Sequence, residues 1–431
     1  MLESLGLSSV SDLFASVPDA VRLDRDLDIP GPLSESELRR HALDIISRDH
    51  DLQAYACFLG AGIYDHFIPA TVPAITGRSE FYTSYTPYQP EMSQGNLQAI
   101  LEFQTMVCRL TGMEVANASM YDGASALAEA ALMSSRITGR SKWMVSRAVH
   151  PSHRETMRTY AWGSGSTIEE VALSGILTDI DALESWMNAD VSCVVVQQPN
   201  FFGTLEDLAH IETIAHEHGA MFIVSFDPIS LGILKPPGDY NADICVGEGQ
   251  SLGIAPGFGG PLVGLMACKK EYVRQMPGRL VGATVDAEGR RSYTLTLQTR
   301  EQHIRRERAT SNICTNQALN ALAATVYMAT LGSGGLRHVA QLCFQKSHYA
   351  AERTAALDGF GVLFGDQFVK EFVLRCNRPV SDINARLLGE GIIGGLDLGR
   401  FYPEFADHVL LCVTEKRTRQ EIDALVECFA S

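Results

Sequence analysis

The chain has 431 residues, of which 46% are hydrophobic and 20% charged, so it can bury a large core and is not an intrinsically disordered protein. It carries 35 basic and 51 acidic side chains, a net charge of −16, which argues against binding nucleic acid or an anionic membrane through its overall field. No apolar run approaches the roughly 18 residues that span a bilayer, and residues 1–24 lack the basic-then-apolar order of a signal peptide. The ten cysteines include no Cys-x-x-Cys pair, which favours buried thiols over a disulfide framework. We therefore expect a cytoplasmic protein without a membrane segment.

The N-terminal part is predicted to be helical and to lead into an irregular aromatic segment. Ser34 precedes two glutamates, the pattern of a capped helix start. Over 58–94, Gly, Pro, Tyr and Thr crowd together without keeping a helical or strand period. An irregular segment rich in aromatic and hydroxyl side chains is typical of a loop that lines a site or an interface. Residues 1–95 are thus expected to form a helical extension followed by such a loop.

Residues 96–332 predict a large α/β domain in which helices and strands alternate. Helices are expected over 96–110, 122–137, 204–218 and 310–332, and strands over 142–146, 167–171, 193–197, 221–225, 244–246 and 262–267. The third helix would begin at a capping box made by Thr204 and Asp207. Alternation of this kind predicts a mainly parallel sheet flanked by helices.

Residues 333–431 predict a smaller C-terminal α+β domain. Its expected elements are a long helix from the Gly-rich break at 332–335 to about 356, strands over 368–374 and 409–413, and a closing helix over 420–429. The sequence contains no internal repeat and no low-complexity tract.

Two glycine-containing turns invite a phosphate-binding interpretation. Gly60-x-Gly62 lacks the third glycine of a dinucleotide-binding turn, because Asp65 stands there, and we interpret it as a tight turn. At Asp122-Gly123-Ala124 small residues begin a predicted helix and would leave backbone N–H groups open to a phosphate. A merely capped helix is the equally weighted alternative for this second turn.

Two histidine pairs invite a metal-binding interpretation. His216 and His218 end a predicted helix, where imidazoles suit the negative end of the helix dipole. His150 and His153 have no Cys, Asp or Glu nearby at ligand spacing. We therefore predict no metal site at either pair.

An acid at the end of a buried strand is the strongest single signal. Asp227 follows the strand predicted over 221–225, and acids placed there face the crevice in which open α/β sheets bind ligands. In pyridoxal-phosphate enzymes such an acid pairs with the protonated pyridine nitrogen, and a lysine further along the chain forms the Schiff base. No lysine occurs between 236 and 268, and Gln250 and Ser251 fill the expected slot before a Gly-rich loop. A serine cannot form an imine, so covalent attachment of the cofactor is not expected.

Seven long strings spread over the chain resemble one known family nearly verbatim. They are residues 58–66, 85–91, 116–124, 298–306, 309–315, 394–403 and 412–417. They are similar to the N-terminal or α subunit of the glycine decarboxylase P-protein. The resemblance implies the α/β fold of the fold type I, aminotransferase-like pyridoxal-phosphate enzymes.

The resemblance also implies a division of labour between two subunits. In the two-subunit form of the family, the β subunit carries a His-Lys pair where Gln250 and Ser251 stand here. This chain would then hold no catalytic residue and no covalent cofactor, and it would complete an α2β2 enzyme whose pyridoxal phosphate lies on the β subunit. The implied reaction is decarboxylation of glycine, with the cofactor as electron sink, and transfer of the aminomethyl group to the lipoyl arm of the H-protein.

Two segments are expected to reach the partner subunit's site, since in this fold loops of one protomer enter the site of the other. The segment 82–91 offers hydroxyls and aromatic rings, and the loop 257–260 offers backbone N–H groups for the partner's phosphate. Arg300 is a candidate for an anion contact, with a structural ion pair as the alternative. The candidate contacts are Tyr82, Thr83, Ser84, Tyr85, Thr86, Tyr88, Gln89, Glu91, Gly257, Gly259, Gly260 and Arg300, and the candidate vestigial cofactor site is Asp122, Gly123, Ala124 and Asp227.

Two other functions stay open at this point. One is a self-sufficient pyridoxal-phosphate enzyme that uses Lys235 or Lys269, and the other is a pseudoenzyme with a structural or regulatory role. A chain built as half of a pseudo-symmetric dimer would expose a large apolar surface when alone. We therefore expect homodimers or aggregation of the isolated chain and heterotetramers with the β subunit.

Overall fold

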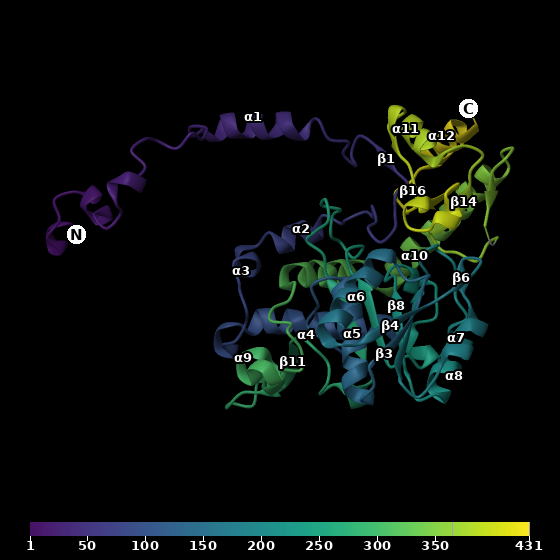
Figure 1. Cartoon of the computed structure of the whole chain (residues 1–431), viewed down its shortest axis with the longest axis horizontal. Helices are drawn as coiled ribbons and strands as arrows, with labels where there is room; N and C mark the ends of the chain where they lie inside the picture. The colour runs from purple at the N-terminus through teal and green to yellow at the C-terminus, as the bar shows by residue number, and fades with distance from the viewer. Residues whose placement is uncertain (364, 431) are drawn as a thin grey trace. The chain divides into compact units, whose positions relative to one another are not determined.

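The computed structural model describes residues 1–363 and 365–430 (Figure 1). Their contacts divide the chain into two units, Met1–Asp51 and the residues from Leu52 onward. The first unit contains the 3₁₀ turns η1 (Glu3–Leu5), η2 (Val10–Phe14) and η3 (Asp19–Val21) and the helix α1 (Glu35–Ile46). Ser34 caps α1 as predicted, because its Oγ accepts from the Glu37 N–H while the Glu37 carboxylate accepts from Ser34. None of the residues in these four elements is buried.

The second unit is built on a seven-stranded sheet with the strand order β2-β10-β9-β8-β7-β3-β4. The strands are β2 (Val115–Ala116), β3 (Lys142–Ser146), β4 (Thr167–Val171), β7 (Val191–Gln198), β8 (Met221–Phe226), β9 (Ile244–Glu248) and β10 (Gly264–Cys268). Five neighbours from β9 to β4 run parallel, whereas β10 is antiparallel to both β9 and β2. The prediction of a mainly parallel sheet is confirmed.

Helices cover both faces of this sheet (Figure 1). On one face lie α5 (Gly123–Thr138) and α6 (Pro151–Ser164). On the other, α7 (Ile180–Trp186) and α8 (Leu208–Glu217) cover β7 and β8, while α4 (Gln94–Thr111) and α10 (Ala318–Ala355) cover β9 and β10. Because both faces are covered, the central strands are continuous apolar runs and not alternating ones.

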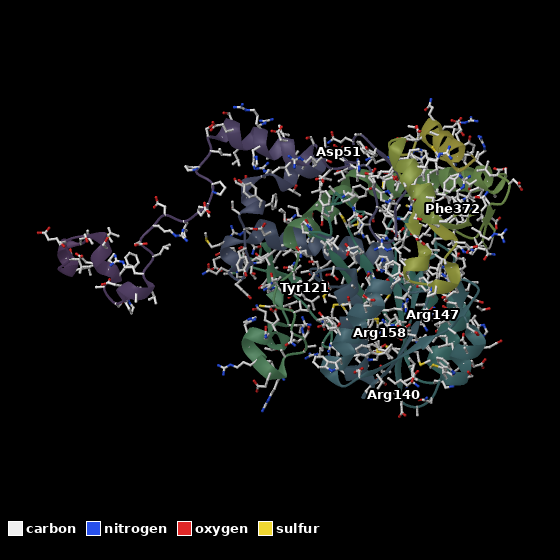
Figure 2. All side chains as sticks on the ribbon, turned by 45° about the horizontal axis from the view of Figure 1, so that its top comes forward. Asp51, Tyr121, Arg140, Arg147, Arg158 and Phe372 are labelled. Carbon is white, nitrogen blue, oxygen red and sulfur yellow. The ribbon has the colours of Figure 1, made fainter. Side chains whose placement is uncertain are left out.

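A four-stranded antiparallel sheet near the C-terminus packs against the carboxyl edge of the large sheet. Its order is β13 (Gly361–Val362), β14 (Glu371–Arg375), β17 (His408–Cys412) and β16 (Leu396–Asp397). One face is covered by α11 (Val380–Gly389), α12 (Arg419–Ala430) and the end of α10. From the other face Val373 packs with Phe202 and Tyr402, and Tyr402 donates to the carbonyl of Arg147. Arg147 follows β3 and is labelled in Figure 2. These contacts hold the start of β14 at the crevice.

The remaining strands and α-helices are short. They are β1 (Ala56–Cys57) paired with β15 (Ile392–Ile393), the hairpins β5 (Leu173–Ser174) with β6 (Leu177–Thr178) and β11 (Leu280–Val285) with β12 (Arg291–Thr296), and the helices α2 (Thr71–Thr76), α3 (Ser79–Tyr82) and α9 (Gln302–Arg305). None of the helices in the described ranges combines the length and the apolar character needed to cross a membrane.

Two predicted helix starts need correction. Asp207 alone caps α8, its carboxylate accepting from His210, whereas Thr204 forms a β-bridge with Phe368 and takes no part in a capping box. The helix predicted from 310 begins only at Ala318, because polar contacts of the preceding residues with the 118–119 turn hold that stretch out of the helix. The break predicted at 332–335 is present, with φ 61° at Gly332 inside α10. The domain boundaries at 95/96 and 332/333 stay predictions.

Candidate functional site

The carboxyl ends of the parallel strands bring the predicted cofactor residues to one edge of the large sheet. β8 and β9 are parallel neighbours, with Phe226 paired to Gly247, so Asp227 and Glu248 follow each other across that edge. Such an edge is where ligands bind in open α/β sheets. The structure thus places Asp227 directly after β8, at the carboxyl edge of the sheet.

Asp227 is already paired within the chain. Its Oδ1 lies 2.8 Å from the Nζ of Lys370, which precedes β14, and its Oδ2 accepts from the hydroxyl and the N–H of Ser230. Burial alone would raise the pKa of Asp227, but the Lys370 ammonium and its hydrogen bond lower it. Burial would lower the pKa of Lys370, but Asp227 raises it. The pair is thus fully ionised and buried.

Lys370 continues a chain of buried polar groups. Its Nζ lies 3.4 Å from the ring centroid of Tyr64 and 3.4 Å from Nε2 of His66, whose Nδ1 lies 2.6 Å from Glu415 Oε2. Because Lys370 can only donate, His66 accepts at Nε2 and donates from Nδ1 to the carboxylate. Burial would raise the pKa of Glu415, but the hydrogen bond from His66 contributes most to lowering it to about 2.

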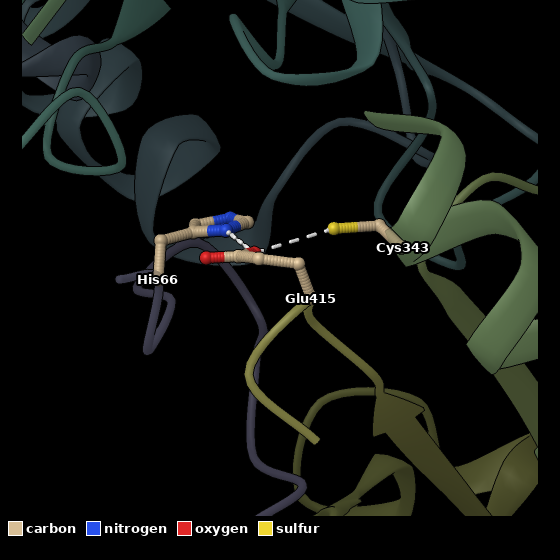
Figure 3. Close-up of side chains that lie close together, drawn as sticks. All are labelled: His66, Cys343 and Glu415. Atoms are coloured by element: carbon tan, nitrogen blue, oxygen red, sulfur yellow. Dashed lines mark hydrogen bonds and ion pairs between the residues drawn. The ribbon is translucent and has the colours of Figure 1, made fainter. Parts of the chain in front are cut away.

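His66, Cys343 and Glu415 converge closely enough to suggest a metal site (Figure 3). The Cys343 thiol lies 3.5 Å from the same Glu415 oxygen that His66 contacts. Two ligands of a tetrahedral zinc ion are separated by roughly 3.3 Å, given metal–ligand bonds near 2 Å. A separation of 2.6 Å between Nδ1 and Oε2 is that of a hydrogen bond. We interpret the cluster as a structural hydrogen-bonded group.

The lysine slot holds two buried polar residues with different roles. Ser251 is buried, and its Oγ has no hydrogen-bond partner among the described residues. Gln250 accepts from the N–H of Tyr64 and donates to the carbonyls of Tyr64 and Ile254. Gln250 therefore connects the 60–66 loop to the end of β9 through its two hydrogen bonds with Tyr64.

The N-terminus of α5 is capped from both sides. Asp122 Oδ1 accepts from Ser125 N at 2.7 Å, and Glu248 Oε2 accepts from Gly123 N at 2.9 Å. Burial raises the pKa of Glu248 to about 7, against three hydrogen bonds from backbone N–H groups that lower it. Of the N–H groups of Gly123, Ala124 and Ser125, the first and the third thus have acceptors within the chain. These contacts favour the capped-helix alternative for this turn.

The crevice residues do not fit pyridoxal phosphate in this chain. The acid for a pyridine nitrogen is bound by Lys370, and the N–H group for a phosphate is bound by Glu248. The cavity that remains beside Asp227 has a volume of about 20 Å³ and is lined in part by Tyr64, Gln197 and Glu371. That is room for about one water molecule.

The two lysines proposed for a self-sufficient enzyme lie away from this crevice. Lys235 is exposed and its ammonium stacks 4.2 Å above the ring of Tyr240. Lys269 lies 2.6 Å from Asp243, which precedes β9 and so belongs to the amino edge of the sheet. Neither contacts Asp227.

The rings of His150, His153 and His216 make contacts with other residues of the chain. His216 lies 2.7 Å from Glu212 and 2.8 Å from Asp243. His150 accepts from Ser152 N and faces the carbonyl of Ala61 with its other ring nitrogen. His153 stacks on His150, and burial lowers the pKa of His153 to about 3. These contacts are those of structural imidazoles.

The two segments predicted to reach a partner are exposed and flank the start of α10. Tyr82 and Tyr85, 55% and 83% exposed, line a groove with residues of α4 and with Leu319 and Leu322. In the second segment the side chain of Phe258 is 99% exposed. Asn320 of α10 donates to the carbonyl of Leu262, directly after that loop.

Several other candidates, in these segments and at Arg300, make contacts within the chain. Tyr88 is 44% exposed and accepts from Arg279. Gly259 and Gly260 have φ of 103° and 149°, and Gly257 accepts from Gly260 N. Arg300 is 9% exposed, and its guanidinium donates to the carbonyls of Met276, Gly278 and Leu297. That guanidinium is therefore engaged in holding its own chain.

Comparison with known proteins assigns the family. The model of the family described as glycine cleavage system P-protein matches residues 1–429. The chain belongs to the glycine cleavage system P-protein family. Two relatives, from Anoxybacillus flavithermus and Desulforamulus reducens, are 52% and 54% identical, and each match covers 99% of this chain and 95% of the relative. Both are named probable glycine dehydrogenase (decarboxylating) subunit 1.

Solved structures agree with this assignment. A crystal structure of glycine decarboxylase (P-protein) in inhibitor-bound form superposes with a TM-score of 0.93 at 43% identity, over 100% of this chain and 96% of that one. A sphingosine-1-phosphate lyase from Burkholderia pseudomallei shares the fold, with a TM-score of 0.66 at 15% identity over 96% and 93% of the two chains. This confirms the predicted fold type I class.

Sequence analysis of this P-protein family member missed Lys370 and Glu248. Only seven lysines occur, and the pattern considered for Asp227 places a Schiff-base lysine further along the chain, whereas its ion-pair partner Lys370 is 143 positions away. Glu248 ends β9, the strand before the position at which Ser251 stands in place of the Schiff-base lysine. An acid at a second strand end on the same edge was the signal available in the sequence.

Proposed function

We propose that this chain is the first of two different subunits of a glycine dehydrogenase (decarboxylating) and that its partner holds the pyridoxal phosphate. The observation that carries the proposal is the full-length similarity to relatives named subunit 1 of that enzyme. The crevice supports it, because Asp227 and Gly123 already have internal partners. With its partner, the enzyme would decarboxylate glycine and pass the aminomethyl group to the lipoyl arm of the H-protein.

The exposed aromatic segments are the parts of this chain that we assign to the partner. Tyr85 and Phe258 leave large apolar side chains in solvent on both sides of the start of α10. Exposed apolar surface of this kind marks an interaction site. In an α2β2 assembly these segments would wall the partner's crevice, and the loop 257–260 would supply N–H groups near its phosphate.

Reconstitution with the second subunit tests this role. Tyr85→Ala should lower glycine–bicarbonate exchange without loosening the tetramer, because it removes a wall of the site. Gly259→Val should lower the cofactor content of the tetramer, because valine is strained at φ 103° and reshapes the loop. Trp162→Ala is the matched control, since Trp162 is 87% exposed on α6, outside both segments.

Two outcomes would favour the other candidate functions. Normal exchange and cofactor content in both variants, with intact assembly, would leave this chain only a scaffolding role. A stoichiometric borohydride-stable adduct at Lys235 or Lys269 of the isolated chain would favour a self-sufficient enzyme. The contacts of Lys235 with Tyr240 and of Lys269 with Asp243 do not support a Schiff-base role for either lysine.

A further inference from the structure

We propose that, in this chain, Lys370 and Glu248 occupy the two positions that would bind the pyridine nitrogen and the phosphate of the cofactor. Ser251 is then only one of three barriers to cofactor binding. The inference concerns the chain's own crevice and does not depend on the partner subunit. It predicts that restoring a lysine at position 251 alone creates no cofactor site.

The first barrier is the ammonium of Lys370. It presents a cation and an N–H donor to Asp227 Oδ1 at 2.8 Å, which is what a protonated pyridine nitrogen would offer. The side chain is 3% exposed, and the ring of Tyr64 lies 3.4 Å from its Nζ. Lys370 thus satisfies the charge of Asp227 and also fills the space beside it.

The second barrier is the carboxyl group of Glu248. Its Oε2 accepts from Gly123 N, the type of donor that a helix N-terminus offers to a phosphate. Its Oε1 accepts from Gln250 N and Val263 N, so the group is held from three sides. The backbone N and the Cβ of Glu248 lie only 3.0 Å from the position of a Cβ built on Gly123. Whether protonated or ionised, Glu248 leaves no room for a phosphate there.

The two barriers act together with the closed shape of the crevice. Gln250 ties Tyr64 to the end of β9, and Tyr64 donates to Glu371, which places the 60–66 loop over the crevice. Only about 20 Å³ remains beside Asp227. A pyridine ring would therefore require removal of a side chain and not a mere rotation of one.

The test is a set of full-length variants incubated with pyridoxal 5′-phosphate, reduced with borohydride and mapped by mass spectrometry. A lysine amine condenses with the aldehyde and releases water, and borohydride reduces the C=N bond to a stable amine. Ser251→Lys alone should give no adduct at position 251. The triple variant Ser251→Lys, Lys370→Ala, Glu248→Ala should give a stoichiometric adduct there. Ser251→Lys with Lys269→Ala is the matched control and should behave like the single variant.

Two results would overturn the proposal. One is a stoichiometric adduct at position 251 in the single variant, and the other is a folded triple variant without one. A second measurement decides the case if the triple variant does not fold. Butylammonium should raise the Tm of Lys370→Ala by filling the vacated ammonium position, and it should not raise the Tm of wild type or of Lys269→Ala. An unchanged Tm of Lys370→Ala would then refute the role of Lys370.

Discussion

Two aspartate–lysine pairs lie at opposite edges of the large sheet, and their contact distances are nearly equal. Lys370 Nζ is 2.8 Å from Asp227 at the carboxyl edge, and Lys269 Nζ is 2.6 Å from Asp243 at the amino edge. The side chain of Lys370 is 3% exposed, whereas that of Lys269 is 24% exposed. The two lysines therefore differ in how completely they have left water, whereas both aspartates are largely buried, at 11% for Asp227 and 5% for Asp243. Burial of the ion pair sets the cost of leaving one partner alone.

The pairs also differ in the elements that they join. Lys370 directly precedes β14 of the C-terminal sheet and lies 143 positions after Asp227, so this pair connects two sheets. Lys269 follows β10, the strand next to Asp243, so the second pair ties two neighbouring strand ends. Since the contact distances are nearly equal, we expect burial and the elements that are joined to decide how much each ion pair contributes to stability.

The largest effect is expected from breaking the carboxyl-edge pair. Lys370→Met would leave the Asp227 carboxylate buried without its counter-ion, and the free energy of unfolding should fall by about 3–5 kcal/mol. Urea unfolding measures it. The double variant Lys370→Met, Asp227→Leu should recover most of this loss, because the unpaired charge is gone. A single variant as stable as wild type would contradict the role of burial in the comparison.

A smaller effect is expected at the same edge from Glu248. Its folded-state pKa of about 7 exceeds its ordinary value of 4.5, so between these values the folded chain binds more protons than the unfolded chain. The stability that Glu248 contributes is therefore present at low pH and lost as pH rises toward and through 7. In Glu248→Gln this fall should be absent from unfolding curves taken across that range. A wild-type slope in the variant would assign the pH dependence to another group.

Breaking the amino-edge pair should cost less. In Lys269→Met, Asp243 keeps its contacts with His216 and the N–H of Phe222, and the ammonium that is lost was 24% exposed. We expect a loss of about 1 kcal/mol or less. Urea unfolding beside Lys370→Met gives the comparison directly, and equal losses in the two variants would remove the distinction between the edges.

The smallest effect is a pH dependence at the amino edge. Hydrogen bonding to Asp243 contributes most to raising the pKa of His216, with a further contribution from Glu212. The stability from protonated His216 is then complete below about pH 6.5, its ordinary pKa, and is lost as pH rises through the raised value. His216→Gln should remove this loss, which amounts to under about 1 kcal/mol for so exposed a contact. Both contributions to stability fall as pH rises, but for different reasons. Asp243 stabilises the cation of His216, whereas burial destabilises the anion of Glu248.

The sequence was most informative where a pattern is local. The strands β3 and β4 have the predicted bounds, because apolar runs between polar turns define a strand without reference to distant residues. The start of α8 was misplaced because Thr204 followed by Asp207 resembles a capping box, and only the bridge from Thr204 to Phe368 shows that Thr204 lies outside the helix. Local spacing carries no information on such a bridge.

The site could be predicted in part for the same reason. Asp227 was found because strand ends share an edge, and Ser251 because the absence of a lysine can be counted in the sequence. The partners Lys370 and Glu248 follow from how the C-terminal sheet packs on the crevice and how β9 meets α5. Those contacts join elements that the sequence pattern leaves independent of each other.

The pair between Asp227 and Lys370 has a consequence for how this chain opens. Since it bridges the large sheet and the start of β14 and is largely buried, separating the two sheets requires exposing both charges at once. Local openings of the C-terminal sheet that leave the crevice intact are thereby made costly, and the two sheets are coupled into one cooperative unit. Amide hydrogen exchange near the crevice would then report a single joint opening of both sheets. A chain fixed in this way would move as one rigid body.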